Sequence, residues 1–181
     1  MKNFNSLLLV AGLVLLLTSC VSVRAGGAFG SLKDEYNSES YKQSSQKNQL
    51  ASSTNSETGF YVGVFFNEIP ITDDLELEPG ISYVGIKDLD LIHFPVLVKY
   101  NFDEKFSASA GPSLSYFLDQ PDAFKSLGFG INAGLSYEFV EDFSLEVKYD
   151  IGLSNLIDNA PSGNSLKFSQ FMVGVAYQFK N

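Results

Sequence analysis

The chain of 181 residues is the size of one domain, and its 45% hydrophobic content with a mean hydropathy of +0.04 suits a soluble protein and a membrane barrel equally. A formal net charge of -9, with no cluster of Lys and Arg, argues against a phosphate-binding surface, so we expect no nucleic-acid partner. Because Cys20 is the only cysteine and His93 the only histidine, we expect no intramolecular disulfide, no metal site and no cofactor.

Residues 1–20 have the pattern of an export signal. Lys2 precedes an apolar run from Leu7 to Leu17, which is shorter than the roughly 20 residues that a membrane-spanning helix needs. We therefore predict a signal peptide over 1–20 and one domain over 21–181. The end of the signal also resembles a lipobox, in which Cys20 would be lipidated. We favour ordinary cleavage, because the residues that follow already alternate, and keep lipidation of Cys20 as the alternative.

Apolar and polar residues alternate along most of the remaining chain. Val21 to Gly30 alternates weakly and predicts a first strand. Residues 33–57 are rich in Ser, Asn, Gln and charge without any period, which predicts a long polar loop. Period-two alternation then predicts seven further strands. They are 59–68, 74–86, 91–102, 105–117, 127–139, 142–154 and 167–179.

The connections between these strands alternate in length. Short joints at 70–73, 103–104 and 140–141 alternate with longer ones, at 33–57, 118–126 and 155–166, and only the joint 87–90 breaks this rule. Strands of about 11 residues, tilted by about 40°, cover the apolar height of about 25 Å that a membrane barrel needs. The fold predicted is all-β, an eight-stranded antiparallel up-and-down transmembrane β-barrel of the outer membrane. Tyrosines near strand ends, Tyr61 among them, are expected at the level of the lipid headgroups.

The charged side chains of these strands all lie on the face opposite to the apolar one. In 142–154, Val147 lies on the apolar face, and Glu146, Lys148 and Asp150 lie on the other. A Lys at the bilayer midplane costs about 2–4 kcal/mol, so the charged face must point into the lumen. An eight-stranded lumen is only wide enough for its own side chains, which predicts a charge network and no pore. The predicted members are Arg24, Glu76, Glu78, Lys99, Glu138, Glu146, Lys148 and Asp150.

Several stretches, in a fixed order and spacing, carry a family resemblance. They are Gly59 to Phe65 (GFYVGVF), Leu75 to Tyr83 (LELEPGISY), Phe94 to Tyr100 (FPVLVKY), Ala110 to Pro112 (AGP) and Leu145 to Leu153 (LEVKYDIGL). Together they resemble the outer membrane protein β-barrel domain family, which includes PorT-like proteins. The resemblance implies an eight-stranded outer-membrane barrel whose first strand is Val21 to Gly30. It implies no assigned activity, and a role as an accessory of protein secretion belongs to the PorT-like branch.

Two other classes of protein remain as alternatives. A soluble lipocalin-like periplasmic carrier has the same number of strands, but its apolar side chains line the cavity. An outer-membrane enzyme would need a base next to a nucleophile, and His93 faces the lumen beside Ser113 and Ser115. We interpret this cluster as ordinary lumenal hydrogen bonding, and the pair Glu76 and Glu78 as partners for cations, so no enzyme is predicted.

The predicted function is structural or adhesive. A closed lumen leaves the loops 33–57, 118–126 and 155–166 to make contact with an extracellular partner. The expected surroundings are outer-membrane lipid around a monomer, inserted by the barrel-assembly machinery through the C-terminal strand 167–179.

Overall fold

The computed structural model describes residues 21–36, 53–66, 69–87, 89–118, 125–157 and 164–179. Its strands are β1 (Val21–Tyr36), β2 (Ser53–Phe66), β3 (Ile69–Pro70), β4 (Leu75–Ile86), β5 (Leu89–Asn101), β6 (Phe106–Phe117), β7 (Leu127–Val140), β8 (Phe143–Gly152) and β9 (Asn164–Phe179). Eight of them build the barrel, and the two-residue β3 forms a small hairpin with β4. In the same residues, no helix is long and apolar enough to cross a membrane.

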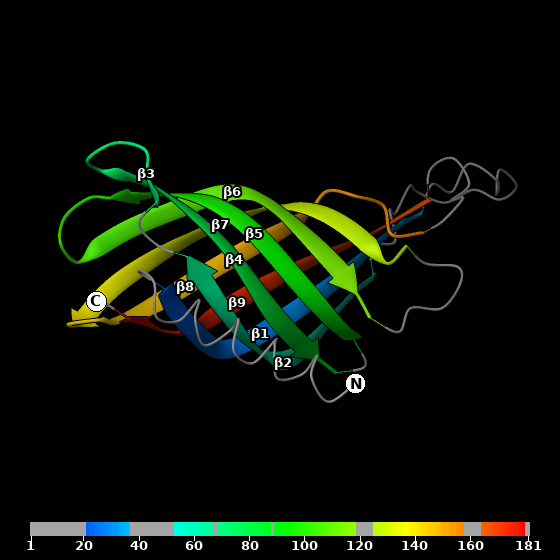
Figure 1. Cartoon of the computed structure of the whole chain (residues 1–181). Coiled ribbons are helices and arrows are strands. Elements are labelled where there is room, and N and C mark those ends of the chain that lie inside the picture. The colour runs from blue at the N-terminus through cyan, green and yellow to red at the C-terminus, as the bar shows by residue number, and fades with distance from the viewer. Residues whose placement is uncertain are drawn as a thin grey trace, which may run out of the picture.

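The sheet closes on itself, as Figure 1 shows. Each strand pairs antiparallel with its neighbour, and β1 and β9 pair from Val21 opposite Phe179 to Tyr36 opposite Asn164. The pairing of β2 with β4 completes the ring. Closure leaves no unpaired edge in the wall, which lipid requires because it cannot hydrogen-bond to the backbone. The predicted eight-stranded antiparallel barrel is confirmed.

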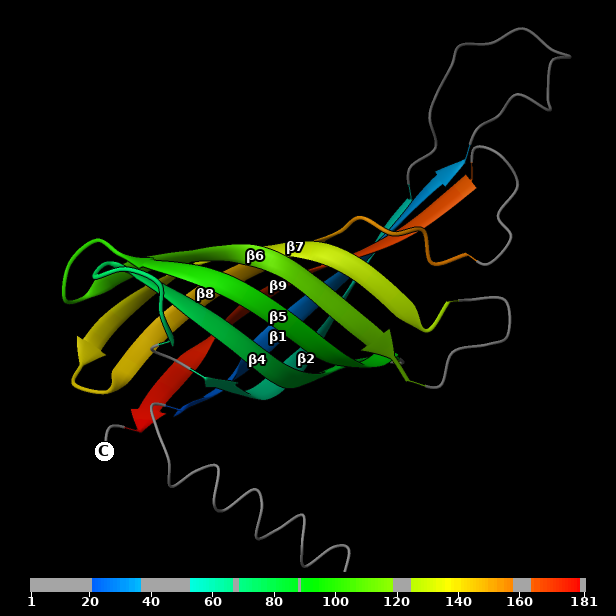
Figure 2. The same ribbon diagram turned by 45° about the horizontal axis from the view of Figure 1, so that its top comes forward.

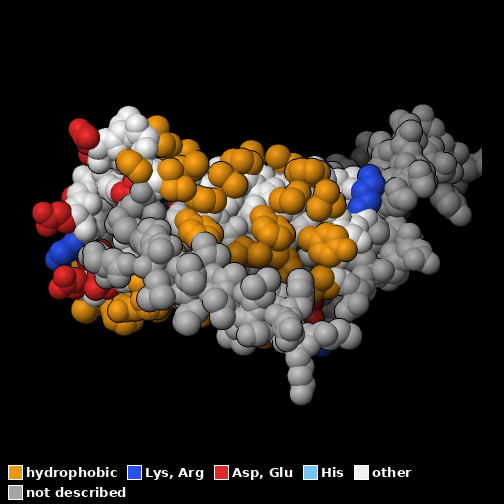
Figure 3. Space-filling view, in the orientation of Figure 1, with side chains coloured by type: hydrophobic (Ala, Val, Ile, Leu, Met, Phe, Trp, Pro, Cys, Tyr) orange, Lys and Arg blue, Asp and Glu red, His pale blue; other side chains and the backbone are white. Residues whose placement is uncertain are grey.

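The outside of the barrel is apolar. On β7, Phe129 and Leu135 are 58% and 65% exposed, whereas Asn132 between them is 1% exposed. Figure 3 shows such apolar side chains as a band over the middle of the barrel, with charged side chains toward its two ends. A band of this kind faces hydrocarbon. A soluble carrier, which would turn these side chains into its cavity, is therefore not favoured.

The connections differ at the two ends of the barrel. At one end, short turns over 102–105 and 141–142 join β5 to β6 and β7 to β8. Asp142 has a φ of 67°, which places it in the left-handed region that Asp tolerates better than most residues. We call this the turn end, and the opposite one the loop end. In outer-membrane barrels the short turns face the periplasm and the long loops face outward.

Asp103 holds the turn between β5 and β6. Its Oδ1 accepts hydrogen bonds of 2.7 Å from the backbone N–H groups of both Lys105 and Phe106. These two bonds favour the charged carboxylate, so the pKa of Asp103 lies below its ordinary value. A single aspartate thereby fixes the geometry of an exposed turn.

Three strands continue past the barrel wall at the loop end. β2 pairs with β4 only from Gly59 onward, and β9 pairs with β8 only from Gln170 onward. Beyond these points β1 still pairs with β9, as far as Tyr36 opposite Asn164. Figure 2 shows the result as a ribbon of β1, β2 and β9 that extends beyond the other strands. We call it the protruding sheet, and it comprises residues 31–36, 53–58 and 164–169.

The protruding sheet corrects the predicted loop over 33–57. Residues 33–36 and 53–57 are strand, and 37–52 lie outside the described residues. These segments carry no alternating set of apolar residues, so their sequence lacks the period-two pattern that predicts a strand. The predicted loop 155–166 is too long for the same reason, because β9 begins at Asn164.

Candidate functional site

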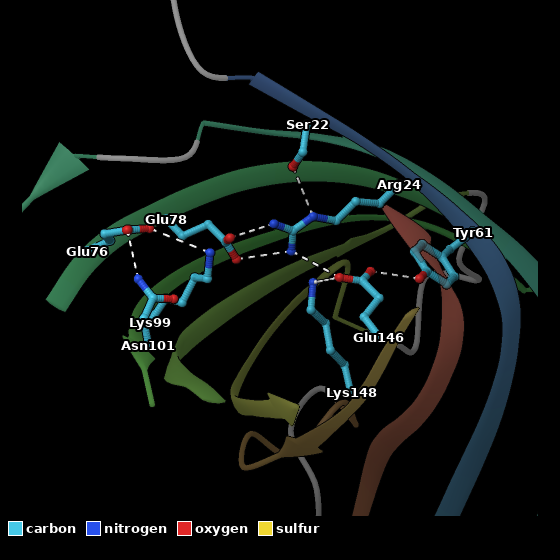
Figure 4. A network of polar contacts seen from close by, with 9 residues as sticks. All are labelled: Ser22, Arg24, Tyr61, Glu76, Glu78, Lys99, Asn101, Glu146 and Lys148. Atoms are coloured by element: carbon cyan, nitrogen blue, oxygen red, sulfur yellow. Dashed lines mark hydrogen bonds and ion pairs between the residues drawn. The ribbon is translucent and has the colours of Figure 1, made fainter. Parts of the chain in front are cut away.

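Arg24 lies at the centre of an ion network in the turn-side half of the lumen (Figure 4). Its guanidinium donates to both carboxylate oxygens of Glu78 across the lumen, with 3.0 Å from Nη1 to Oε2. Its Nε donates to Ser22 Oγ at 3.1 Å, and Nη1 lies 3.2 Å from Oε2 of Glu146. The planar fork of Arg therefore ties strand β1 to both β4 and β8.

Glu146 is the second junction of the network. It accepts a hydrogen bond of 2.8 Å from the Tyr61 hydroxyl and lies 2.9 Å from Lys148 Nζ. The ring of Phe65 lies below both cations, with its centroid 4.0 Å from Arg24 Cζ and 4.3 Å from Lys148 Nζ. Two cations thus face two carboxylates, which is the balance that buried charges require.

A separate ion pair lies nearer the turn end. Lys99 Nζ is 3.6 Å from Glu76 Oε2, and Asn101 donates to Glu76 Oε1 at 2.8 Å. Glu138, which the sequence placed in the same network, is half-buried at the turn end of β7. No ion pair joins Glu138 to the described residues, so it lies apart from the other predicted members.

A layer of small polar side chains follows toward the loop end. His93 Nδ1 is 3.0 Å from Ser115 Oγ, and its Nε2 is 3.6 Å from Asp150 Oδ2 and 3.5 Å from Asn132 Nδ2. Ser113 donates a hydrogen bond of 2.5 Å to Asp150 Oδ2. We call this group the Asp150 layer, and with the neighbouring Gln170 it comprises His93, Ser113, Ser115, Asn132, Asp150 and Gln170.

The loop-side half of the lumen is filled by apolar side chains. We call this cluster the apolar cap, and its buried members are Ala28, Val84, Ile86, Leu91, Phe117, Leu156, Phe168 and Met172, with Tyr61 at its inner side. Small cavities remain among the described side chains, such as one of about 30 Å³ between the charges and one of about 10 Å³ beside Ser115 and Asp150. Ion network, polar layer and apolar cap together close the lumen.

Some sequence predictions fall outside the described residues. They include the signal peptide, Cys20, and most of the predicted loops, namely 37–52, 119–124 and 158–163. Among the residues that are described, no group of three or more His, Cys, Asp and Glu side chains is placed to hold a metal ion.

Several lumenal residues escaped the sequence reasoning. Tyr61 was expected at the headgroups, yet it is 2% exposed inside the lumen, and Phe65 lies beside it on the same face of β2. The sequence contained a signal for both residues. Tyr61 and Phe65 lie two residues before and two residues after Gly63, so they share its inward face on β2. Gln170 and Met172 gave the same signal, because they lie four and two residues before Gly174 on the inward face of β9. What the sequence does not tell is which end of the lumen is filled by apolar side chains.

A closed antiparallel barrel with an apolar exterior and a charged, filled interior is a small integral protein of the bacterial outer membrane. A family model described as "Outer membrane protein beta-barrel domain" matches residues 11–179. The chain therefore belongs to this family, whose membership the sequence resemblance had predicted. The PorT-like subgroup is not distinguished by the match. A search of curated proteins finds no relative.

Solved structures of small outer-membrane barrels are similar to the chain. Neisserial surface protein A (NspA) is 16% identical with a TM-score of 0.50, covering 90% of this chain and 100% of its own. The outer membrane enzyme PagL is 15% identical with a TM-score of 0.50 and the same coverage of 90% and 100%. OprG from Pseudomonas aeruginosa is 15% identical, with a TM-score of 0.48 and coverage of 91% and 97%. At such identities the likeness concerns the fold alone.

Proposed function

We propose that this barrel acts at the cell surface as an adhesive or structural protein, through its protruding sheet and loops. The observation that carries the proposal is the protruding sheet itself. Within the described residues, the outer edge of 53–58 on β2 has no strand partner, whereas Asn155 and Leu156 hydrogen-bond to Leu166 on the β9 side. An open edge offers backbone donors and acceptors to an extended segment of a partner.

Transport through the lumen is disfavoured. The ion network fills the turn-side half and the apolar cap fills the loop-side half, and both must separate before a solute passes. Apolar constrictions also oppose ions by dewetting. We therefore expect no conductance steps when the purified chain is inserted into planar bilayers, and stable single-channel currents would contradict this inference.

We also infer that the contact of Ser115 with His93 is not catalytic. Both side chains are buried, and the adjoining cavity of about 10 Å³ has room for about one water, far less than an acyl substrate needs. Leu156 and Phe168 of the apolar cap line the same cavity. The cluster therefore lacks the access that hydrolysis of a lipid or peptide requires.

The route to the membrane is part of the proposal. The segment 1–20 would direct export, and the barrel-assembly machinery would then read β9, which ends in the aromatic pair Tyr177 and Phe179. Because ring closure leaves the wall without an unpaired edge, we propose a monomer in lipid. Crosslinking in native outer membranes tests this last point, and a defined dimer would contradict it.

The adhesive role is tested by removing most of the β1 and β2 part of the protruding sheet without disturbing the barrel. Ser31 lies opposite Ser56, so an Asn-Gly turn can join them in place of 32–55 and keep the register of the wall. Cells that express the shortened chain are compared with wild type for attachment to polystyrene and to a cultured cell layer, autoaggregation and bile-salt resistance. We expect a severalfold loss in at least one of these measurements.

A matched control exchanges the exposed residues 71–74 at the turn end for Gly-Ser-Gly-Ser. Both variants must show the heat-dependent mobility on SDS gels that marks a folded barrel. Loss of adhesion or integrity in the shortened chain but not in the control supports the proposal. Unchanged measurements in a folded, surface-exposed shortened chain would overturn it.

A further inference from the structure

The buried charged side chains of the lumen form three groups. Two of these groups contain equal numbers of positive and negative charges, and the third contains a carboxylate without a matching cation. Lys99 pairs with Glu76, and the cations Arg24 and Lys148 face the two carboxylates Glu78 and Glu146. The remaining carboxylate, Asp150, is 2% exposed, and its titratable contact is His93, which is charged only when protonated. The Asp150 layer therefore needs one positive charge that the neighbouring groups, already paired, do not supply.

Unpartnered polar atoms lie on both sides of this carboxylate. Asn132 on β7 is directly opposite Asp150 on β8, and Asp150 is directly opposite Gln170 on β9, so the three form one inward row. Asn132 Oδ1 and both amide atoms of Gln170 have no hydrogen-bond partner. Asn132 is 1% exposed and Gln170 is fully buried, so bulk water does not satisfy them.

We propose that the Asp150 layer binds one small monovalent cation of the Na⁺ type, together with water. Its ligands are the Asp150 carboxylate, the two amide oxygens of Asn132 and Gln170, and Ser113 Oγ, which keeps its lone pairs while it donates to Asp150. Oxygen atoms of this kind are the ligands that hard cations prefer. A single carboxylate matches a charge of one, in contrast to the several acidic ligands of a divalent site.

A proton on His93 would supply the charge but leave the row unsatisfied. His93 reaches Asp150 and Asn132, yet the amide of Gln170 would stay without a partner. A hydrated cation solves both problems, because the ion contacts the carbonyl oxygen and its water accepts from the Gln170 N–H. Lys148, two residues before Asp150 on the same face, forms its ion pair with Glu146, and none joins it to Asp150.

Glycines keep the layer open. A Cβ on Gly130 would lie 2.8 Å from both Asp150 Oδ1 and Ser113 Oγ, so any other residue there would displace the ligands. The cavity of about 10 Å³ next to Asp150 is bordered by Ser115, Gly128 and Gly152, and it has room for about one water that would hydrate the ion. Leu156 and Phe168 of the apolar cap line the same cavity.

The test measures the stability of the full chain in lipid nanodiscs as a function of cation. Urea unfolding is followed in NaCl and in choline chloride at equal ionic strength, since choline is too large for the cavity. A ligand that binds only the folded state raises the ratio of folded to unfolded chain about tenfold for each tenfold rise in its concentration above Kd. We expect this dependence for Na⁺ and none for choline, and equal stability in the two salts would overturn the proposal.

Variants locate the effect. In Asp150→Asn the Na⁺ dependence is expected to disappear, whereas it should persist in Glu138→Gln, which removes a carboxylate outside the network. Persistence in a folded Asp150→Asn would overturn the site. A third outcome is that stability does not depend on Na⁺ but increases as the pH falls, and that this increase is absent in His93→Gln. This outcome would show that a proton on His93 supplies the charge, and it would overturn the proposed cation site.

A measurement on the unmodified chain covers the case in which Asp150→Asn fails to fold. Wild-type crystals soaked slowly or grown in Tl⁺, an anomalous scatterer of similar charge, are expected to show a peak in contact with Asp150 and Gln170. Crystals in which Asn132, Asp150 and Gln170 are ordered but no anomalous peak contacts them would overturn the proposal. These outcomes are independent of whether the protruding sheet is adhesive.

Discussion

Tyr61 and Glu146 are joined across the lumen by a hydrogen bond of 2.8 Å between strands β2 and β8, which share no backbone pairing. The bond ties together two parts of the wall that are separated by β1 and β9 on the shorter way round the barrel. Glu146 also lies next to both buried cations, Arg24 and Lys148. One carboxylate thereby holds three strands around the same point.

We predict that Glu146→Gln strongly destabilises the barrel. The variant leaves two buried cations facing one carboxylate, and removing one member of a buried ion group costs about 3–5 kcal/mol. Glu138→Gln is the matched control, because Glu138 is half-buried and no ion pair joins it to the described residues. We expect a change of about 0.5 kcal/mol or less for the control. Urea unfolding in nanodiscs measures both, and equal losses would contradict the network.

The direction in which β8 faces is tested by a pair of lysine substitutions. Val147 is on the lipid side and 37% exposed, whereas Ser144 is half-buried and borders the turn-side cavity of about 30 Å³. Val147→Lys places a charge in hydrocarbon at a cost of about 2–4 kcal/mol and should prevent insertion, while Ser144→Lys should be tolerated. The folded fraction on unboiled SDS gels measures both. Similar losses of the folded fraction in both variants would mean that the two faces of β8 are assigned wrongly.

Alternation along the sequence was sufficient to predict the wall. Each strand that contacts lipid on one side has the period of two, and the turns between them have the short, polar composition of tight connections. The protruding sheet escaped prediction because Lys33 to Tyr36 and Ser53 to Thr58 extend past the wall and carry no alternating set of apolar residues. These segments are held by backbone hydrogen bonds between β1 and β2 and between β1 and β9. Backbone pairing does not depend on side chains, so the amino-acid composition does not indicate it.

The sequence located lumenal charges better than it located their contacts. The alternating facing of side chains along a strand places Arg24, Glu78 and Glu146 inside, because the opposite face contacts hydrocarbon, where a charge is costly. It does not say that Arg24 reaches Glu78 across the lumen, since that depends on the stagger between strands around the closed barrel. The same alternation places Glu138 inside, although its position at the end of β7 leaves it outside the network.

The turn between β5 and β6 should loosen in acid. The pKa of Asp103 is lower in the folded chain than the value of about 3.9 for a free Asp, because Lys105 and Phe106 donate to its charged form. A depressed pKa contributes stability above the unfolded value, and this contribution is lost as the pH falls through the folded value. The protection factor of the Phe106 amide, which is the intrinsic exchange rate divided by the observed rate at the same pH, should therefore fall at low pH when followed by NMR in micelles. Asp103→Asn should remove this pH dependence, and a wild-type protection factor that does not change with pH would contradict the prediction.

Gly174 on β9 lies directly beside the Tyr61 hydroxyl. A Cβ at this position would overlap the hydroxyl oxygen and the carbonyl oxygen of Ala25 on the paired strand β1. Overpacking costs about 1–3 kcal/mol and occasionally more, and a backbone neighbour yields less than the end of a side chain. We therefore expect Gly174→Ala to lower the free energy of unfolding by at least about 3 kcal/mol.

The matched control for Gly174→Ala is Gly27→Ala on β1. A Cβ on Gly27 would meet the ring of Phe29 at 3.7 Å, an ordinary contact, so the change should stay within about 0.5 kcal/mol. Tyr61→Phe alone also removes the hydrogen bond to Glu146, so it serves as the reference for the double variant. In the Tyr61→Phe background, Gly174→Ala should cost less than in the wild type, because the overlap with the hydroxyl is gone while the overlap with Ala25 remains. Urea unfolding of the four variants decides the point, because equal costs for Gly27→Ala and Gly174→Ala would place Tyr61 elsewhere in the lumen.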